Sequence, residues 1–425
     1  MTGFRRLRHR ELLATIVVCF LIVGAGLLIA QDQDTLRIQT GVAARDPRFP
    51  EYLARLLGHP LTSGDGYLVH TNGDRAFPAM LSAIEQAATR ISLETYIFAD
   101  DETGKRFADA LEAAGRRGVA VHLVLDAVGA GNMAEADIQR LEKAGVKVGW
   151  YNEVASYSLE EANYRTHRKI LVVDGEVAFV GGMGFSNNWA VDAEDNPKWR
   201  DTHVELHGPV VDDIEAGFNE NWIETGGVVE PQVHATDGPA AGSGSSVVVR
   251  SSPQGGANSL KLLYLLAIAA ARETIDIQSP YVVTDESTRW SLSDARRRGV
   301  RIRILMEGDL TDAKPVKFAG RAAYETLLRQ GIELYEYQPA MMHTKAMIVD
   351  GALGIVGSAN FDNRSLELND ELNVVVFDRD FTARLLADFE SDRQRSARID
   401  LEQWRSRPLH IRGREKGWSL FGELF

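Results

Sequence analysis

The chain repeats one polar motif in its two halves, and this repeat limits the possible folds more than any other feature. Each copy begins with His-x-Lys, has an Asp seven residues after the His, and has a Gly seven residues after that Asp. A lone His-x-Lys usually belongs to a solvated strand edge, but two copies at matched offsets predict a duplicated fold. The copies are His167, Lys169, Asp174 and Gly181, and His343, Lys345, Asp350 and Gly357.

The sequence around each motif is repeated as well. Apolar residues at helical spacing over 76–90 and 104–118 alternate with strand-like runs over 91–100 and 119–126. The same order recurs in the second half, with helices expected over 260–273 and 288–299 and strands over 274–285 and 300–307. This alternation predicts an α/β fold in which helices cover both faces of a mixed sheet in each half.

Between the two halves, residues 226–246 are rich in Gly, Ser, Pro and Ala and lack periodicity, which is typical of a linker. The predicted organisation is an N-terminal tip and membrane anchor (1–35), a first half (36–225), the linker (226–246), a second half (247–400) and a tail (401–425). The tail mixes Arg and Lys with Trp, Leu and Phe, so it suits either a membrane surface or a helix docked on the body.

An apolar segment near the N-terminus predicts a single transmembrane helix. Residues 12–30, LLATIVVCFLIVGAGLLIA, are uncharged and follow a cluster of four Arg, with Glu11 between them. Their length suits the bilayer core, whereas the apolar part of a cleavable signal peptide, the alternative, is shorter. The basic flank predicts a cytoplasmic N-terminus and an extracytoplasmic body at the cell membrane.

Composition narrows the chemistry. The single Cys, Cys19, excludes an intramolecular disulfide, and the ten His form no metal-binding pattern, so neither a metal nor another cofactor is expected. The formal charge is −13 although the first ten residues are basic. Such an acidic body disfavours nucleic acid as a partner, because nucleic-acid binding begins with phosphate neutralisation.

The repeated His-Lys pair suits phosphodiester chemistry. Residues i and i+2 of a strand share a face, so each motif presents an imidazole beside an ammonium group. One imidazole can attack phosphorus while the other protonates the leaving oxygen and later deprotonates the incoming hydroxyl. The two Lys would stabilise the non-bridging oxygens. Asp174 and Asp350 complete the motif in the candidate catalytic set, although their spacing favours a turn away from the phosphate, and Arg168 is expected on the opposite face of its strand.

With these motifs the chain resembles the phospholipase D superfamily, whose signature is His-x-Lys-x4-Asp followed by Gly-x-x-Asn, and it is most similar to the bacterial cardiolipin synthases. The likeness covers most of residues 60–410, including LETYIFADDETGKRFADAL, HRKILVVDGEVAFVGGMGFSNNW, WRDTHVELHGPVV and HTKAMIVDGALGIVGSANFDNRSLELNDELN. The resemblance implies two α-β-α sandwich halves related by pseudo-twofold symmetry, with one active site at their interface.

The resemblance also implies roles for individual residues. His167 would be the nucleophile and His343 the general acid and base. Lys169, Lys345 and Asn360 would hold the phosphate, supported by Ser358. An acidic residue after each motif would orient the His of that motif, and Asp201 and Glu371 match those places. Gly184 stands where the family usually has Asn, with Asn187 and Asn188 as the nearby candidates to replace it.

Four functions are compatible with these residues. A cardiolipin synthase would convert two phosphatidylglycerol molecules to cardiolipin and glycerol, and the membrane segment and the resemblance favour it. A phospholipase D hydrolase, or a transphosphatidylase acting on another phospholipid, would use water or another alcohol in the second step. A nuclease is disfavoured by the acidic body, and an inactive scaffold by two intact His-Lys pairs.

Overall fold

The computed structural model describes residues 35–152, 164–190, 197–229, 241–252 and 258–422. The predicted membrane segment, residues 12–30, lies outside these ranges, so the anchor remains a prediction. Within them, no helix has the length and apolar character needed to cross a bilayer.

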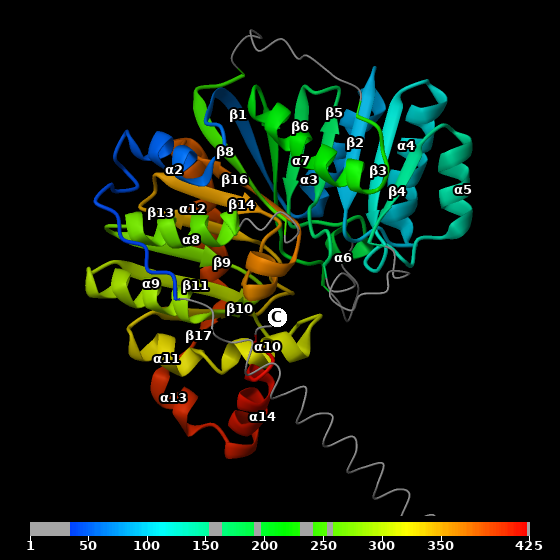
Figure 1. Ribbon diagram of the computed structural model, residues 1–425. Coiled ribbons are helices and arrows are strands. Elements are labelled where there is room, and N and C mark those ends of the chain that lie inside the picture. Colours follow the sequence, from blue (N-terminus) through cyan, green and yellow to red (C-terminus); the bar gives the residue numbers. More distant parts are fainter. Residues whose placement is uncertain (1–34, 153–163, 191–196, 230–240, 253–257, 423–425) are drawn as a thin grey trace, which may run out of the picture. The chain divides into compact units, whose positions relative to one another are not determined.

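The first half alternates strands and helices as the periodicity predicts (Figure 1). A short helix, α2, precedes it at Phe49–Leu57. Its strands are β1 (Thr62–Thr71), β2 (Arg90–Thr95), β3 (Ala120–Asp126), β4 (Lys147–Tyr151), β5 (Ile170–Val173), β6 (Val177–Gly181) and β7 (Thr202–His207). Its helices are α3 (Gly73–Gln86), α4 (Glu102–Arg116), α5 (Glu135–Lys143), α6 (Asn187–Ala190) and α7 (Val210–Glu224).

The second half repeats this order. Its main strands are β8 (Gly244–Ser251), β9 (Thr274–Gln278), β11 (Arg301–Glu307), β12 (Glu333–Tyr337), β13 (Ala346–Val349), β14 (Leu353–Gly357) and β16 (Glu371–Val376). Its helices are α8 (Ser259–Ala270), α9 (Glu286–Arg297), α10 (Lys314–Arg321), α11 (Tyr324–Arg329) and α12 (Arg379–Gln394). The strand expected over 274–285 is divided, because β9 ends before Ser279-Pro280 and a two-residue strand, β10 (Val282–Val283), pairs instead with β15 (Phe361–Asp362).

Among the described residues, both halves form one continuous sheet with the strand order β17-β12-β11-β9-β13-β14-β16-β8-β1-β7-β6-β5-β2-β3-β4. Reading outward from the centre, β1-β7-β6-β5-β2-β3-β4 has the same order as β8-β16-β14-β13-β9-β11-β12. The two central strands, β1 and β8, pair antiparallel, as a twofold axis between equivalent halves requires.

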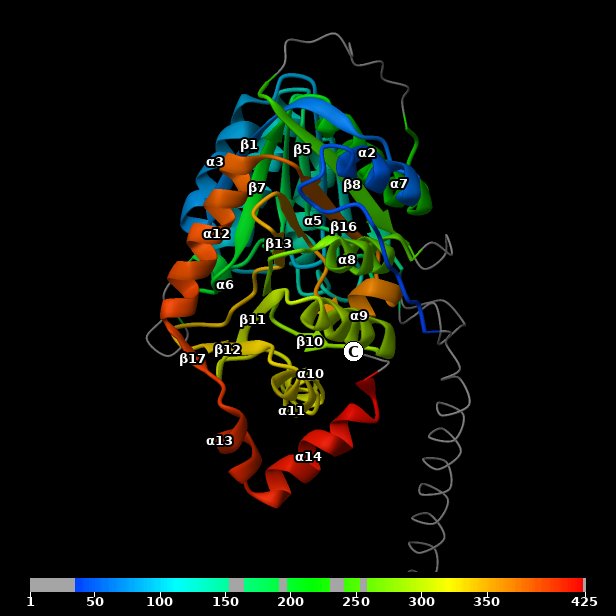
Figure 2. The same ribbon diagram turned by 90° about the vertical axis from the view of Figure 1, so that its left-hand side faces the viewer.

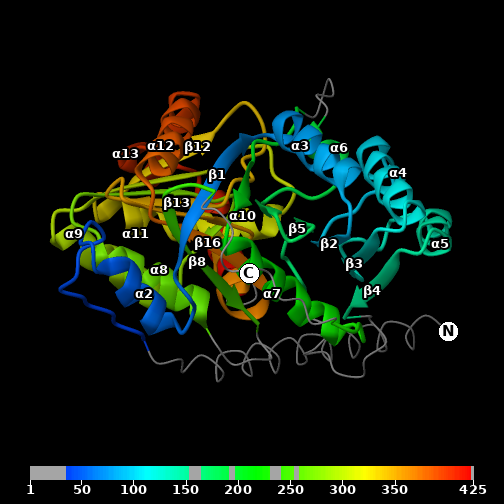
Figure 3. The same cartoon turned by 90° about the horizontal axis from the view of Figure 1, so that it is seen from above.

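Helices cover both faces of this sheet. Successive side chains of a strand point to opposite faces, so each strand packs against helices on both sides. In β5, Leu171 and Val173 pack with α3 and α4, whereas Ile170 and Val172 pack on the side of α7. Near the centre, α3 and α12 lie on one side of β1, and α7 and α8 lie on the other (Figures 2 and 3).

The C-terminal tail is helical and packs on the second half. After a short edge strand, β17 (Ser396–Arg398), come α13 (Leu401–Ser406) and α14 (Leu409–Ser419). The Arg414 guanidinium lies 4.0 Å from the Phe318 ring centre of α10. Of the two placements expected for the tail, docking on the body is observed for these helices. The linker is predicted to end at residue 246, but β8, the first strand of the second half, already begins at Gly244.

Candidate active site

Both His-Lys motifs lie at the carboxyl edge of the parallel strands in their own half. β2, β3 and β4 are parallel, and β5 runs antiparallel to β2, so residues just before β5 lie where β2 ends. His167 and Lys169 occupy this place, and His343 and Lys345 precede β13 in the same way. Ligands of open α/β sheets bind at this edge.

Two short parallel bridges bring the edges of the two halves together. Thr166 pairs with Asp370, and Arg200 pairs with Met342. Through these bridges the amide of His167 donates to the Asp370 carbonyl at 2.9 Å, and the amide of His343 donates to the Arg200 carbonyl at 2.7 Å. The backbone of each His is therefore held by the other half of the molecule.

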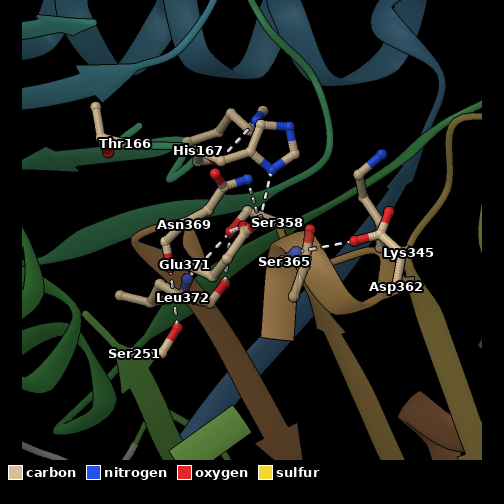
Figure 4. Close-up of polar contacts among 12 residues, drawn as sticks. Thr166, His167, Ser251, Lys345, Ser358, Asp362, Ser365, Asn369, Glu371 and Leu372 are labelled. Carbon is tan, nitrogen blue, oxygen red and sulfur yellow. Dashed lines mark hydrogen bonds and ion pairs between the residues drawn. The ribbon is translucent and has the colours of Figure 1, made fainter. Parts of the chain in front are cut away.

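The imidazole–carboxylate pairs also cross between the halves. His167 Nδ1 lies 2.8 Å from Glu371 Oε1, and His343 Nδ1 lies 2.7 Å from Asp201 Oδ2. Figure 4 shows His167 directed at Glu371, which lies on a strand of the second half. The expectation that each acid would orient the His of its own motif is therefore wrong in its pairing, because the bridges place each His nearer the acid of the other half.

Each carboxylate is fully buried and has further hydrogen bonds. The Ser358 hydroxyl donates to Glu371, and Trp189 Nε1 donates to Asp201 Oδ2 at 2.9 Å. Although burial opposes it, the partners of Glu371, chiefly His167, lower its pKa to about 2. His343 likewise lowers the pKa of Asp201 against the effect of burial. Both acids therefore stay ionised at neutral pH.

The two imidazoles are largely buried and neutral before substrate binds. Burial lowers the pKa of His167 to about 4, against the opposing effect of Glu371, and burial lowers the pKa of His343 as well. In a neutral ring whose Nδ1–H faces a carboxylate, Nε2 carries the free lone pair. The carboxylates thus select the tautomer in which Nε2 can accept a proton or attack.

The two Lys of the motifs flank these rings. Lys169 Nζ donates to the His167 carbonyl at 2.6 Å, and Lys345 Nζ donates to the His343 carbonyl at 2.7 Å, which leaves each ammonium with further N–H groups. Burial lowers the pKa of Lys169 to about 7 and that of Lys345 to about 8. The positive charge of Lys345 contributes to the lowered pKa of both Lys169 and His167, so the charges of the two halves interact.

The loops that follow β6 and β14 differ between the halves. Asn360 is buried, and its Oδ1 has no hydrogen-bond partner among the described residues. At Gly184, the equivalent position, an added Cβ would lie 2.8 Å from the Ile97 Cβ, which leaves no room for an Asn. Asn187 does not take its place, because its Oδ1 accepts from the Thr103 amide at 3.0 Å and from the Thr103 hydroxyl at 2.8 Å. Asn188 has no described side-chain hydrogen bond that would assign it this role.

Asp174 and Asp350 lie away from the two His, at the opposite ends of β5 and β13. Asp174 is five residues beyond Lys169, or about 16 Å along a strand. Its carboxylate accepts 2.8 Å bonds from the amides of Ala88, Thr89 and Arg90. Asp350 binds the equivalent amides of 272–274 in the same way. The candidate catalytic set therefore loses both Asp residues, whose contacts fit the turn role that their spacing favoured.

Arg168 points away from the site, as its place between His167 and Lys169 predicts. Its side chain is fully buried on the α7 side, where it donates to the Gly217 and Ser251 carbonyls at 2.6 and 3.2 Å. It also forms a 3.0 Å ion pair with Glu220. Arg168 therefore joins β5 to α7.

Sequence reasoning missed the aromatic residues that pack on the catalytic rings. Tyr96 meets His167 edge-on with ring centres 5.5 Å apart, and Lys169 Nζ lies 5.6 Å from the Tyr96 ring centre. Trp199 and Trp189 lie 5.2 and 5.4 Å from His343. Tyr96 follows a strand-like run at the site edge, and the two Trp lie shortly before Asp201. Their places in the sequence therefore indicated that these aromatic residues lie near the site.

A buried polar group behind His167 was also missed. Glu94 accepts from the Thr166 hydroxyl and, at 2.6 Å, from Asn221 Nδ2. Burial raises the pKa of Glu94 to about 7. These bonds support Thr166, the neighbour of His167, from the α7 side of the sheet. Over the described ranges, no three His, Cys, Asp or Glu side chains are grouped to bind a metal ion.

A duplicated α/β fold in which one His-Lys motif from each half reaches a shared edge is the architecture of phospholipase D-like enzymes. The chain belongs to the family described as cardiolipin synthase, PLD-like domain, whose model matches residues 80–222 and 264–393.

Similar proteins agree with this family. The probable cardiolipin synthase YwiE of Bacillus subtilis is 32% identical over 385 residues, which cover 90% of this chain and 77% of the relative. Cardiolipin synthase 2 of Bacillus anthracis is 34% identical and covers 83% and 70%. The crystal structure of phosphatidylserine synthase from Haemophilus influenzae shares the fold, with a TM-score of 0.68 at 12% identity over 88% of this chain and all of that one.

Proposed function

We propose that the protein is a membrane-anchored phosphatidyltransferase of the cardiolipin synthase type, which converts two phosphatidylglycerol molecules to cardiolipin and glycerol. The observation that carries this proposal is the crosswise arrangement of two buried His–carboxylate pairs, each built from both halves. The cardiolipin synthase relatives supply the substrate class, because a shared fold alone does not fix a substrate.

In the first step, His167 Nε2 attacks the phosphorus of one phosphatidylglycerol. A P–N bond forms and the P–O bond to glycerol breaks, so the phosphatidyl group is held on the imidazole as a phosphohistidine. Glu371 accepts the Nδ1–H bond and stabilises the positive charge that develops on the ring. His343, whose protonated form the anionic substrate favours, donates a proton to the leaving glycerol oxygen.

In the second step, the headgroup hydroxyl of another phosphatidylglycerol enters on the same side. His343, now neutral, takes the hydroxyl proton while the oxygen attacks phosphorus and the P–N bond breaks. This releases cardiolipin and restores both imidazoles. One phosphodiester replaces another, so the exchange needs no nucleotide and no other energy source.

The remaining motif residues bind the phosphate. Lys169 and Lys345 supply ammonium groups from the two halves, and Asn360 supplies an amide on the second half only, with Ser358 acting through Glu371. Such preorganised donors stabilise the negative charge on the non-bridging oxygens in the transition state. At other phosphoryl-transfer sites, metal ions stabilise this charge. The proposed reaction therefore requires no metal or other cofactor.

The proposed location is the cell membrane, with residues 12–30 as a single span, the N-terminus in the cytoplasm and the catalytic body outside. Two exposed apolar side chains support approach to lipid at the site edge. Val128 follows β3 and is 52% exposed, and Leu310 follows β11 in the other half and is 38% exposed. Apolar residues on the loops that flank a site are suited to contact with lipid chains.

One assay distinguishes this function from its alternatives. Purified full-length protein is incubated with phosphatidylglycerol labelled in its acyl chains, and the lipid products are separated. Labelled cardiolipin is expected among the lipids, and free glycerol is expected in the aqueous phase. Phosphatidic acid as the only product would indicate a hydrolase, and cleaved DNA without any lipid product would indicate a nuclease.

Substitution of the proposed nucleophile provides the first prediction. His167→Ala should remove lipid turnover, a loss of at least about 10³-fold, and should prevent labelling of the protein with ³²P from phosphatidylglycerol, because no phosphohistidine can form. Thermal unfolding of the variant controls for folding. Persistent turnover or protein-bound label in His167→Ala would show that another residue attacks.

A further inference from the structure

A carboxylate from the loop after β11 lies beside the second half of the site. The hydroxyl of Tyr281 donates a hydrogen bond to Asp312 Oδ1. No hydrogen bond to Asp312 Oδ2 is formed by the described residues, and the Asp312 side chain is exposed. A carboxylate next to a phosphate site repels the anion. It is better suited to accept a hydrogen bond from a hydroxyl group of the ligand.

The backbone around Tyr281 fixes this carboxylate near the phosphate-binding residues. The Ser279 hydroxyl donates to the Tyr281 carbonyl at 2.6 Å and accepts from the Phe361 amide at 2.9 Å. β10 follows Tyr281 directly, and its Val282 pairs with Phe361, the residue after Asn360. Tyr281 is thus tied to the segment that carries Asn360.

The same tyrosine connects to the surroundings of His343. Its ring packs against the hydrophobic cluster that contains Met341 and Trp199. The Trp199 ring centre is 5.2 Å from that of His343, and Met341 is two residues before His343. Together with the effect of the Asp312 charge on His343 and Lys345, this packing places Asp312 and Tyr281 on the second-half side of the site, where the leaving glycerol departs in the proposed reaction.

The charge of Asp312 acts on this side of the site. Burial and Lys345 lower the pKa of His343, and the negative charge of Asp312 opposes that shift. Asp312 also opposes the effect of burial on the pKa of Lys345, and it adds to the raised pKa of Tyr96 in the first half. Its carboxylate is therefore within electrostatic reach of residues from both halves.

Glu307 adds a second, independent observation. It ends β11 and is 2% exposed, and its polar neighbour Thr311 lies in the loop that carries Asp312. Burial raises its pKa to about 9, so it carries an O–H donor at neutral pH. At the equivalent end of β3, Asp126 instead accepts from the Val128 and Gly129 amides, at 2.9 and 3.0 Å. In the second half, the strand-end carboxyl interacts instead with the loop that carries Asp312.

We propose that Asp312, with Tyr281 and Glu307, forms a subsite for the hydroxyl groups of the glycerol headgroup. The carboxylate of Asp312 accepts from a polyol hydroxyl, and the buried, neutral Glu307 adds no second negative charge to the subsite. This inference rests on the proposed phosphatidyl transfer and makes it more specific. The subsite holds the leaving glycerol and then the headgroup of the acceptor beside His343, and it favours polyols over simple alcohols.

The test compares two acceptors in one reaction. Full-length protein is incubated with phosphatidylglycerol in mixed detergent micelles. Labelled glycerol and labelled 1-propanol are present at equal concentrations. Labelled phosphatidylglycerol and phosphatidylpropanol are then measured for wild type, Asp312→Asn and Asp309→Asn. Asp309 is the matched control, because it lies in the same loop and its side chain is 94% exposed.

Asp312→Asn should lower the ratio of glycerol to propanol transfer about tenfold, because the polyol hydroxyl then donates to a neutral amide oxygen and not to a carboxylate. Asp309→Asn should leave the ratio unchanged. An unchanged ratio in Asp312→Asn, or equal losses with both acceptors, would overturn the subsite. Absence of both products with wild-type protein would instead overturn the proposed function on which the subsite depends.

Discussion

Burial sets the protonation states of the imidazole and ammonium groups at the centre of the site, and local partners set those of the two carboxylates. His167 and His343 are kept neutral, while Glu371 and Asp201 remain charged because each accepts several hydrogen bonds. The two Lys are the groups nearest to a change of charge at neutral pH. A bound phosphodiester would favour their charged forms, so substrate binding and protonation are coupled.

This arrangement predicts the pH dependence of kcat/KM, which reports the free enzyme. His167 must be neutral to attack, and with a pKa of about 4 it meets this condition at any higher pH. Lys169 and Lys345 must be charged, and with pKa values of about 7 and 8 they lose their protons as the pH rises. His343 must be protonated to act as the general acid, and burial lowers its pKa in the free enzyme. We therefore expect kcat/KM to rise above about pH 4 and to fall at higher pH, first as His343 and then as the two Lys lose their protons.

Initial rates at low phosphatidylglycerol concentration, measured from pH 4 to 9, check this prediction. The fraction of folded protein is followed by circular dichroism at each pH. A value of kcat/KM that stays level or increases up to pH 9 would contradict it.

The hairpins β5–β6 and β13–β14 are the elements that hold the motifs in place. Asp174 and Gly175 form the turn of the first hairpin with φ values of 54° and 70°, and Asp350 and Gly351 form the second with 53° and 61°. Positive φ at both central residues is the reason for Asp-Gly at these positions. The carboxylates then tie each turn to the start of a neighbouring strand, which fixes the hairpin relative to the sheet.

Substitution of these turn residues should therefore affect stability and not chemistry. Asp174→Asn and Asp350→Asn each keep a residue that tolerates positive φ but weaken the bonds to the neighbouring amides. We expect a loss of about 1–2 kcal/mol in the free energy of unfolding, and a kcat within about twofold of wild type well below the melting temperature.

Chemical denaturation and lipid turnover measure the two effects separately. Glu176→Gln is the control within the first turn, because Glu176 is exposed. A large loss of kcat in folded Asp174→Asn protein would return this carboxylate to the catalytic set.

The molecule as a whole depends on its two halves being joined, because neither half contains a complete His–carboxylate pair. The central pairing of β1 with β8 and the two short bridges between the edges bring each His to the acid of the other half. Glu371 therefore serves His167, the proposed nucleophile, and Asp201 serves His343, the proposed acid and base.

This crosswise pairing predicts different defects for the two acids. Glu371→Gln should slow attack by His167, and Asp201→Asn should slow protonation of the leaving group, each by roughly 10²–10⁴-fold with phosphatidylglycerol. A phosphatidyl ester of p-nitrophenol needs no protonated leaving group. Release of p-nitrophenol from it should be close to the wild-type rate in Asp201→Asn and should remain slow in Glu371→Gln.

A single-turnover measurement of p-nitrophenol release tests this prediction, with Glu220→Gln as a control carboxylate that contacts neither ring. The opposite pattern, with recovery in Glu371→Gln and not in Asp201→Asn, would indicate that each acid serves the His of its own half.

Much of this architecture could be predicted from the sequence because its signals are local. The period of the apolar residues located α3, α4, α8 and α9 and the strands between them to within a few residues. The strand alternation placed Arg168 opposite His167 and Lys169, and the matched offsets of the motifs predicted a duplicated fold. The spacing from Lys169 to Asp174 also favoured the turn that is observed.

The tertiary structure alone decided which groups meet. Asp201 and Glu371 stand at equivalent positions after similar strands, so no local pattern tells which imidazole each will face. That choice follows from the antiparallel contact of β1 with β8, which joins residues far apart in the chain. The absence of space for an Asn at Gly184 and the effect of the Asp312 charge on His343 have the same origin, because both depend on packing between segments that are distant in sequence.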